Sequence, residues 1–514
     1  MRIGIDVGGT NTDAVLIDGS TVLAETKAAT TKDVTSGIAN ALAGLQATAA
    51  HDPSAVDGVM IGTTHFINAI VQGRDLAPTA AIRLGLPATR ALPPMSGWPA
   101  RLVAAVKGRN YLCHGGHEID GRAIAPLRRD ELERAADDIR AHGVQAIAVS
   151  SVYSPINAEC ELEVAEILKE LLPDASISLS HQIGRMGLLE RENATIINAC
   201  LIGLATQICE GLAEAVRAAG IDAPLFLSQN DGTLMGVDQA RRYPVATFAS
   251  GPTNSMRGAA FLSGLRDCAV VDVGGTTTDV GMLHHGFPHE ASTEVSVGGI
   301  RTNFRMPDVL SVGVGGGSRV REDPLTVGPD SVGYRISQEA LVFGGHTLTC
   351  TDIAVAAGIA DIGDRSLVRH LDRSFVQTAL ALIGESIGTA VDRVRTSGNG
   401  IPVVAVGGGS ILVPDQLPGV GAVHRPAHHA TANAVGAAIA QVGGEVDKMC
   451  SVGPGQRDRL LDEAKQEAMD KAIAAGAEPS SVQIVDIDEV PLAYLPGNAT
   501  RIRVKAVGDL LLSR

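Results

Sequence analysis

One eight-residue pattern occurs twice in this chain and constrains its fold more than any other feature. Asp6–Asp13 reads DVGGTNTD and Asp272–Asp279 reads DVGGTTTD, so seven of the eight positions are identical at a separation of 266 residues. Each copy follows a short apolar run with the composition of a buried strand and leads into a second such run. The repeat therefore predicts two related halves, each built around a strand, a tight glycine turn and a second strand.

The residue types in the repeated turn suit a polyphosphate and its metal ion. An aspartate at the end of a strand can hold Mg²⁺ through water, because this small cation gives up its hydration shell reluctantly. Two glycines remove Cβ atoms, so that the backbone can approach phosphate oxygens closely, and threonine hydroxyls add donors. Two such hairpins that face one another would hold one nucleotide from both sides.

Two other common nucleotide-binding signatures are missing from the sequence. The chain contains no G-x-x-x-x-G-K-[ST] sequence, which excludes a P-loop site. Its glycine turns lead into strands rather than into the helix of a dinucleotide-binding unit. Two more glycine clusters are candidates: Gly407-Gly408-Gly409, which follows the strand-like Val403–Val406, for adenosine, and Gly313–Ser318, including Gly316, for a phosphate or a substrate. A plain strand-to-helix turn is the alternative for the first cluster.

The chain is too long for one compact core and divides into three segments. Residues 1–190 are expected to form a first α/β domain, residues 191–445 a second, and residues 446–514 a C-terminal extension of one helix and two strands. Within the first domain, residues 80–126 are rich in proline and irregular in pattern, which predicts an insertion or a lid. The amphipathic stretch Met186–Ala219 is expected to cross from the first domain to the second.

Charge and cysteine content narrow the classes of protein that this chain can be. The formal net charge of −15 and the lack of a Lys/Arg-rich run exclude the basic surface that nucleic acids require. The seven cysteines form no C-x-x-C pair, which suits reduced thiols in the cytosol. No signal peptide precedes the first predicted strand, and no uninterrupted apolar run is long enough to span a membrane. The sequence therefore predicts a soluble, cytoplasmic protein that binds neither nucleic acid nor membrane.

The paired turns belong to a larger set of motifs. Gly62-Thr63-Thr64 with Asn68-Ala69-Ile70 behind it, Ser250-Gly251-Pro252, Gly313–Ser318 and Gly407–Gly409 follow in an order and spacing that resemble the hydantoinase/oxoprolinase family. That family belongs to the superfamily of acetate kinase, sugar kinases, heat-shock ATPases and actin. The resemblance runs from residue 1 to about residue 440. It implies an α/β fold of two actin-like (ribonuclease H-like) domains with ATP in the cleft between them.

The resemblance also implies an activity. Members of the family couple ATP hydrolysis to the opening of a cyclic amide such as hydantoin or 5-oxoproline, and related subunits serve ketone carboxylases. The implied mechanism is phosphorylation of the amide oxygen, which turns a stable amide into an activated imidate, followed by attack of water and loss of phosphate. The implied cofactors are ATP and Mg²⁺. The implied partners are the small cyclic amide and a partner subunit or a second copy of the chain.

Roles at the two turns follow from the same resemblance. Asp6 and Asp272 would position Mg²⁺, while Asp13 or Asp279 would orient the attacking group or a water, or simply cap its turn. The chain's expected contacts with the phosphates and the rest of the nucleotide are Gly8, Gly9, Thr10, Thr12, Gly274, Gly275, Thr276, Thr277, Gly316, Gly407, Gly408 and Gly409.

Substrate contacts are expected just after Gly62, at Thr63, Thr64, His65 and Asn68, with His65 either facing the cleft or packing beneath the turn. Two segments depart from the family pattern. Thr253-Asn254-Ser255 stands where the family has Ala-Gly-Gly, and Gly333-Tyr334-Arg335-Ile336 replaces a Gly-Pro-Ala-Cys-Tyr-Gly segment. Both departures concern the substrate more than the ATP turns. A small-molecule kinase, a carboxylase subunit and a non-catalytic ATP-driven switch therefore stay open as alternatives.

Overall fold

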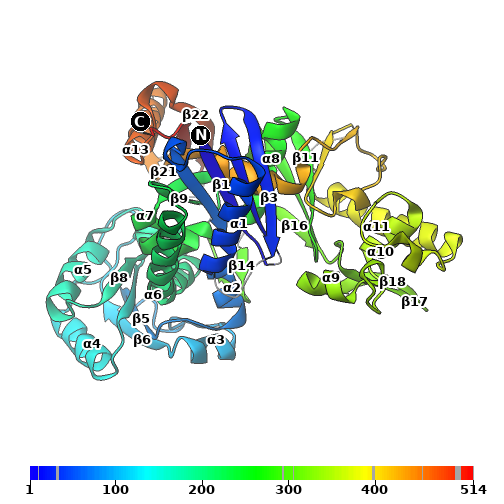
Figure 1. Ribbon diagram of the computed structural model, residues 1–514. Helices are drawn as coiled ribbons and strands as arrows, with labels where there is room; N and C mark the ends of the chain where they lie inside the picture. Colours follow the sequence, from blue (N-terminus) through cyan, green and yellow to red (C-terminus); the bar gives the residue numbers. More distant parts are fainter. Residues whose placement is uncertain are drawn as a thin grey trace.

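The computed structural model describes residues 1–9, 11–29, 34–291, 295–304, 306–395, 400–453, 455–492 and 499–512. Figure 1 shows a central region that holds both chain termini, with one lobe on each side of it. One lobe contains helices α4 (Arg129–Ala141) and α5 (Glu159–Leu171), and the other contains α10 (Cys350–Ala357) and α11 (Arg373–Val394).

The central region is built on a nine-stranded sheet with the order β22-β23-β21-β10-β9-β4-β1-β2-β3. β1 pairs antiparallel with β2 and parallel with β4, so a hairpin lies beside a parallel strand. This single sheet draws strands from all three segments into which the sequence was divided. The strands are β1 (Arg2–Val7), β2 (Asn11–Asp18), β3 (Thr21–Ala29), β4 (Gly58–Thr63), β9 (Leu225–Ser228), β10 (Thr233–Gly236), β21 (Gln441–Ser451), β22 (Gln483–Pro491) and β23 (Ala499–Gly508).

A second sheet repeats the same local arrangement. β11 pairs antiparallel with β12 and parallel with β19, just as β1 pairs with β2 and β4. The apolar runs predicted around the second copy of the repeat thus form the expected strands, because side chains such as Val271 and Val273 are fully buried there. The strands are β11 (Cys268–Val273), β12 (Thr278–His284), β13 (Phe287–Pro288), β16 (Val309–Val312), β19 (Val403–Val406) and β20 (Val423–His424).

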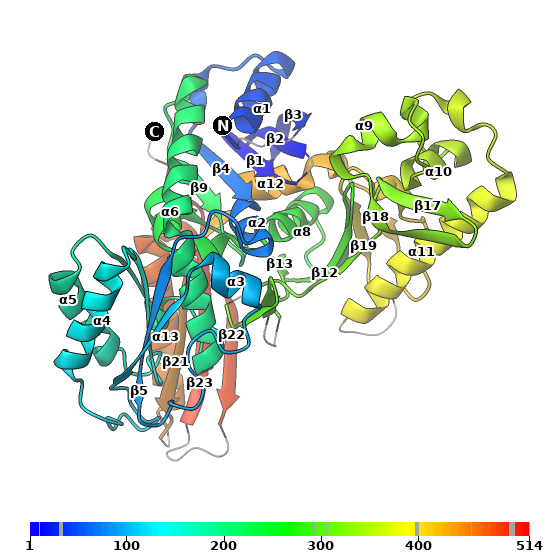
Figure 2. The ribbon, with the colours of Figure 1, turned by 90° about the horizontal axis from the view of Figure 1, so that it is seen from below.

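Two helices, α8 (Ser250–Ser263) and α12 (Ala432–Ala438), join the two sheets. Figure 2 shows them side by side, with β1 and β4 on one side and β12 and β19 on the other. Their backbones approach so closely that a Cβ on Gly258 would lie 1.8 Å from the Ala432 carbonyl oxygen, and one on Gly436 would lie 1.8 Å from the Asn254 carbonyl oxygen. Glycine is therefore required at both positions.

A four-stranded parallel sheet with the order β6-β5-β7-β8 forms the core of the lobe that holds α4 and α5. Residues 80–126, expected from sequence to be an irregular insertion or lid, contribute most of β5, a helix and β6 to this lobe. The prolines Pro93, Pro94 and Pro99 lie in the connection between β5 and that helix, so they do not interrupt either strand. The elements are β5 (Thr79–Leu86), α3 (Ala100–Ala105), β6 (Arg109–His114), β7 (Ala146–Ser151) and β8 (Ser176–Leu179).

The C-terminal segment forms a helix followed by two strands, α13 (Arg457–Ala474), β22 and β23, and both strands join the nine-stranded sheet through β21. The remaining helices and strands complete the two lobes and the central region. They are α1 (Val34–Thr48), α2 (His65–Gln72), α6 (Leu188–Ala218), α7 (Val237–Arg242), α9 (Ile336–Glu339), β14 (Val295–Val297), β15 (Ile300–Thr302), β17 (Ser318–Glu322) and β18 (Leu325–Ser331).

Among the residues that the structure describes, two helices, α6 and α11, are long and apolar enough to cross a membrane when judged by length and composition alone. In α6 the most apolar stretch is 56% buried inside the protein. This helix packs against β7 and α1, so its apolar composition is accounted for by its place in the core. That no membrane is bound stays a prediction.

Candidate functional site

The two repeated turns have the same backbone geometry. The amide of Gly8 donates a hydrogen bond to the Asn11 carbonyl (3.0 Å), and the amide of Gly274 donates one to the Thr277 carbonyl (2.9 Å). Asp6 stands opposite Asp13 in the first hairpin, and Asp272 stands opposite Asp279 in the second. Sequence identity between the copies therefore reflects one turn structure that occurs twice.

The carboxylates of the first hairpin are held together by a residue from the far end of the chain. Asp6 is 4% exposed, and the Asn433 Nδ2 atom of α12 donates to Asp6 Oδ2 (2.9 Å) and to Asp13 Oδ2 (3.2 Å). Asp13 also forms an ion pair with Lys27. Asn433 was not among the residues predicted from sequence, because nothing local marks it.

The carboxylates of the two hairpins influence one another electrostatically. Burial, followed by the charge of Asp13, raises the pKa of Asp6 to about 7, and the charge of Asp272 adds to this rise. Burial likewise raises the pKa of Asp272 to about 6, with contributions from Asp279 and Asp13. The two turns thus converge on one region with excess negative charge. A bound cation would neutralise that charge.

Two polar groups at this point have no partner among the described residues. Asp6 Oδ1 is buried without a hydrogen bond of normal geometry, and so are both polar atoms of the Asn254 carboxamide on α8, although Asn254 lies close enough to lower the pKa of Asp6. A Cβ on Gly62 would lie 2.5 Å from both Asp6 Oδ1 and Asn254 Nδ2, so the glycine keeps this space open. Orphaned acceptors and donors of this kind mark a place where a ligand, an ion or water belongs.

These residues fit Mg²⁺ bound together with a nucleotide. Within the described residues, no group of three or more His, Cys, Asp and Glu side chains is arranged to enclose a metal ion. Mg²⁺ does not need such a cage, since it is commonly bound by one or two carboxylates together with waters and phosphates. Asp6 and Asp272 could supply those carboxylates, one from each hairpin.

The predicted substrate residues lie next to this carboxylate cluster. Thr64 Oγ1 donates to the Val7 carbonyl (3.3 Å) and accepts a hydrogen bond from Asn68 Nδ2 (3.3 Å). Thr63 Oγ1 and His65 Nδ1 are hydrogen-bonded at 2.7 Å, and burial lowers the pKa of His65. Burial thus disfavours the charged imidazole, and Thr63 fixes its orientation; whether the ring faces the cleft stays a prediction.

The start of α8 adjoins the same cluster. A Cβ on Gly251 would lie 4.0 Å from Asp6 Oδ1 and 4.0 Å from Thr64 Cγ2. The Ser250-Gly251-Pro252 motif thus places the N-terminal turn of this helix beside Asp6, where its amides would favour an anion.

Both additional glycine clusters pack directly on the second hairpin. The amide of Gly316 donates to the Gly274 carbonyl (3.0 Å), and a Cβ on Gly407 would lie 2.3 Å from Asp272 Oδ1. A Cβ on Gly409 would lie 3.0 Å from the Gly274 carbonyl oxygen, whereas one on Gly408 would meet nothing within 4 Å. Gly316 thus supports the turn through its amide. Gly408 is exposed, and its contact with adenosine stays a prediction.

Thr12 does not lie where a phosphate contact was expected. Its side chain is 0% exposed, as is that of its counterpart Thr278, whose hydroxyl donates to the Val314 carbonyl (2.6 Å). The alternation of strand side chains turns both hydroxyls into the protein interior. Thr276 and Thr277 are exposed on the second turn, and Thr10 lies outside the described residues.

The second carboxylate of each hairpin has different partners. Asp279 accepts a hydrogen bond from Ser311 Oγ (2.5 Å), and burial raises its pKa. Asp13 instead lies in the network of Lys27 and Asn433. The two hairpins are thus alike in backbone but differ in what surrounds these two side chains.

Comparison with known proteins identifies the family. Residues 2–172 match the model of the hydantoinase/oxoprolinase N-terminal region, and residues 191–401 match the hydantoinase/oxoprolinase model. The caprolactamase subunit alpha of Pseudomonas jessenii is 27% identical over 419 residues, which cover 76% of this chain and 60% of that protein. The acetone carboxylase beta subunit of Xanthobacter autotrophicus is 26% identical over 393 residues, which cover 69% of this chain and 54% of that protein. The chain thus spans less than two thirds of these relatives, both of which are named as subunits.

Solved structures with low sequence identity share the fold. An ATP-dependent caprolactamase from Pseudomonas jessenii matches with a TM-score of 0.78 at 18% identity, covering 99% of this chain and 87% of that one. A nucleotide-free acetone carboxylase matches with a TM-score of 0.69 at 18% identity, covering 100% and 88%. The predicted α/β fold is therefore confirmed. Since two models of one family account for most of the sequence, this chain belongs to the hydantoinase/oxoprolinase family.

Proposed function

We propose that this chain is the ATP-hydrolysing component of an enzyme that opens a small cyclic amide through a phosphorylated intermediate. The observation that carries the proposal is the convergence of Asp6 and Asp272 from two equivalent glycine turns, with an unpartnered oxygen on Asp6. The similarity to a protein named caprolactamase subunit alpha supports a cyclic amide as the substrate class. A resonance-stabilised amide resists water, so coupling its opening to ATP is chemically sensible.

Each group at the site would have its own role in this reaction. Mg·ATP, when bound, supplies the phosphoryl group that activates the amide oxygen. The backbone amides of the two glycine turns would face its phosphates, and Asp6 and Asp272 would hold the Mg²⁺ through water. Asn433 fixes the orientation of Asp6, while the ion pair with Lys27 holds the side chain of Asp13 in place. Thr64 and the first turn of α8 would border the reacting group.

A second candidate function is a subunit of a ketone carboxylase. It is favoured by the acetone carboxylase structure, whose fold matches the whole length of this chain. In both cases we propose that a partner subunit completes the enzyme, since the relatives are named as subunits.

We also propose a cytoplasmic location. All seven cysteines are free thiols and six of them are buried, as expected for a protein of a reducing compartment. Labelled protein that fractionates with membranes or outside the cytosol would contradict this proposal.

Release of ADP by the purified chain tests the main proposal. Mg·ATP is supplied alone, with hydantoin, 5-oxoproline or other lactams, and with a small ketone plus bicarbonate, in the presence and absence of a partner subunit. ADP release stimulated by a lactam, with ring-opened product in matching amount, supports the amidohydrolase. Stimulation only by ketone and bicarbonate supports the carboxylase instead. The Asp272→Asn variant, in which one carboxylate is lost, is expected to show no stimulated release.

A further inference from the structure

Two neighbouring residues of α8, Asn254 and Ser255, lie against the carboxylates of both hairpins. The side chain of each is buried, with 1% of the residue exposed. A Cβ on Gly62 would lie 2.5 Å from Asn254 Nδ2 and 2.5 Å from Asp6 Oδ1, so the carboxamide and the carboxylate face the same point. Burial raises the pKa of Asp272, and a hydrogen bond with the Ser255 side chain opposes that rise. One helix thus supplies a polar side chain to each half of the site.

Asp6 has a carboxamide beside each of its two oxygens. Asn433 Nδ2 donates to Asp6 Oδ2 (2.9 Å), whereas Asn254 lies beside Asp6 Oδ1 without a hydrogen bond of normal geometry. Neither polar atom of the Asn254 carboxamide has such a bond with any described residue. A buried carboxamide in this state costs free energy. Folding alone therefore does not account for Asn254.

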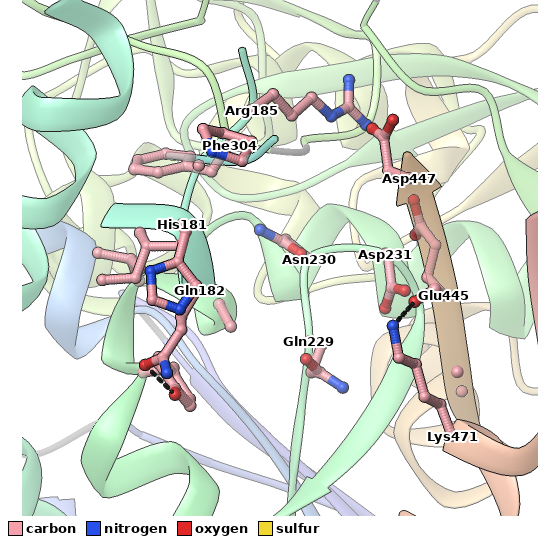
Figure 3. Close-up of a pocket in the computed structure, with 18 of the residues that line it drawn as sticks. His181, Gln182, Arg185, Gln229, Asn230, Asp231, Phe304, Glu445, Asp447 and Lys471 are labelled. Carbon is pink, nitrogen blue, oxygen red and sulfur yellow. Dashed lines mark hydrogen bonds between the residues drawn. The ribbon is translucent and has the colours of Figure 1, made fainter. Parts of the chain in front are cut away.

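The residue before Asn254 attaches α8 to a different part of the molecule. The Thr253 hydroxyl donates to the Asn230 carbonyl (3.0 Å), and the Asn230 amide donates to the Ala246 carbonyl (2.7 Å). Figure 3 shows Asn230 in the middle of a cavity of about 680 Å³, which is lined by none of the residues assigned to the nucleotide, the metal or the substrate. At the next residue of α8, a Cβ on Gly436 of α12 would lie 1.8 Å from the Asn254 carbonyl oxygen. Two contacts thus anchor α8 where it meets the carboxylates.

We infer that Asn254 and Ser255 are positioning residues for the Mg²⁺ site, each holding one of the two carboxylates that bind the ion. The inference rests on the Mg·ATP site of the proposed function, and it does not depend on which acceptor is phosphorylated. In the filled site the Asn254 N–H group donates to Asp6, and its oxygen accepts a hydrogen bond from water, which Mg²⁺ retains when it binds. Both residues lie in the segment Thr253-Asn254-Ser255, in which this chain departs from the family pattern.

Calorimetric titration with ADP measures the contribution of the metal without relying on turnover. The full-length chain is titrated with ADP in Mg²⁺ and in a chelator, and the ratio of the two dissociation constants gives the affinity that the metal adds. In Asn254→Ala and in Ser255→Ala this ratio is expected to fall roughly tenfold or to be lost, because the outer partners of metal-binding groups have effects of this size. The dissociation constant in chelator is expected to stay as in wild type, since neither side chain is assigned to the nucleotide.

Ser263→Ala is the matched control, and it should keep the wild-type ratio. Ser263 is the last residue of α8, and its hydroxyl donates to the Ala259 carbonyl of the same helix (2.7 Å). Thermal unfolding in chelator shows whether a variant is merely unstable. Asn254→Ala is expected to melt no lower than wild type, because the carboxamide that it removes has no hydrogen bond of normal geometry without the ion.

The outcomes separate the failure of this inference from the failure of the proposed function. An unchanged ratio in both variants overturns the inference, and so does an equal loss of affinity with Mg²⁺ and with chelator, which marks a purely structural role. A fall confined to one variant overturns the assignment of the other residue. A wild-type chain whose ADP affinity does not depend on Mg²⁺ overturns the metal site of the proposed function as well. Mg²⁺-dependent ADP binding without any response to lactams overturns the cyclic amide and leaves this inference standing.

Discussion

Asp6 lies in an environment that disfavours the charged form of its carboxylate. The fold buries its carboxylate beside two others and leaves one of its oxygens without a partner, which raises its pKa to about 7. Such a site loses stability in the free protein and regains it when a cation binds. The residue is therefore better explained by ligand binding than by folding.

The variant Asp6→Asn tests this account through the pH dependence of stability. The unfolded chain releases the Asp6 proton near pH 3.8, whereas the folded chain holds it to about pH 7, so stability falls as the pH rises between these values. In a chelator at pH 8 the variant is expected to be more stable than wild type by roughly 1–3 kcal/mol, yet to release no ADP. Chemical unfolding at pH 5 and pH 8 measures the difference. Parallel pH dependence in the two proteins would contradict the assignment.

Asn433→Ala makes a second prediction at this scale. The hydrogen bond from Asn433 favours the charged form of Asp6, so its removal raises the pKa of Asp6 further. The acidic limb of the pH profile for ADP release is expected to move to higher pH. The profile is measured from pH 5.5 to pH 9, a range of about 3.5 units. An unchanged profile would show that Asp6 does not limit the rate.

At the scale of elements, the packing of α8 against α12 decides how the two halves meet. These helices touch through Gly258 and Gly436, and they carry Asn254 and Asn433, the two carboxamides beside Asp6. Close backbone contact therefore sets the position of the site's supporting side chains. A small displacement of either helix would be felt at the carboxylates.

Gly436→Ala tests the importance of this contact. Its new Cβ would fall 1.8 Å from the Asn254 carbonyl oxygen, so the variant is expected to lose roughly 1–3 kcal/mol or more of stability. Gly203→Ala is the matched control, since a Cβ on this exposed glycine of α6 meets nothing within 4 Å. The control should gain roughly 0.5–1 kcal/mol from helix propensity. Thermal unfolding of both variants gives the comparison, and equal effects would show that the helix contact tolerates a methyl group.

At the scale of the whole molecule, the C-terminal extension is part of the central sheet and not an appendage. β21 pairs with β10 and β23, and Arg503 of β23 contacts both Glu445 (3.1 Å) and Glu290 (2.7 Å). Its apolar side chains Ile502, Val504 and Ala506 are fully buried. The beginning, middle and end of the chain thus share one core.

A chain that ends at residue 440 is expected to fold poorly. It loses three of the nine strands and α13, and it exposes Met60 and Leu234, which pack in the same cluster as the lost residues. Its melting temperature should fall by at least about 10 °C if it stays soluble. An unaltered melting temperature would mean that the extension is an independent unit.

The sequence by itself determined the two glycine hairpins, the fold class and the family. A strand–turn–strand unit depends on residues within one short stretch. Its repetition can therefore be recognised in the sequence without knowledge of any distant contact. The departure of Thr253-Asn254-Ser255 from the family pattern was interpreted as a change at the substrate, whereas the structure places Asn254 beside Asp6 of the first glycine turn. The predicted phosphate contact of Thr12 is not seen, because the direction of its side chain depends on which face of the strand is buried.

Only the tertiary structure brought distant residues to the site. Asn433 meets Asp6 across 427 residues, and Asn254 of α8 lies beside the same carboxylate. No local pattern places either residue beside Asp6, since a lone asparagine is ordinary in sequence. Their importance follows from which groups are buried near them and left without partners, and that is decided only when the sheets, α8 and α12 pack together.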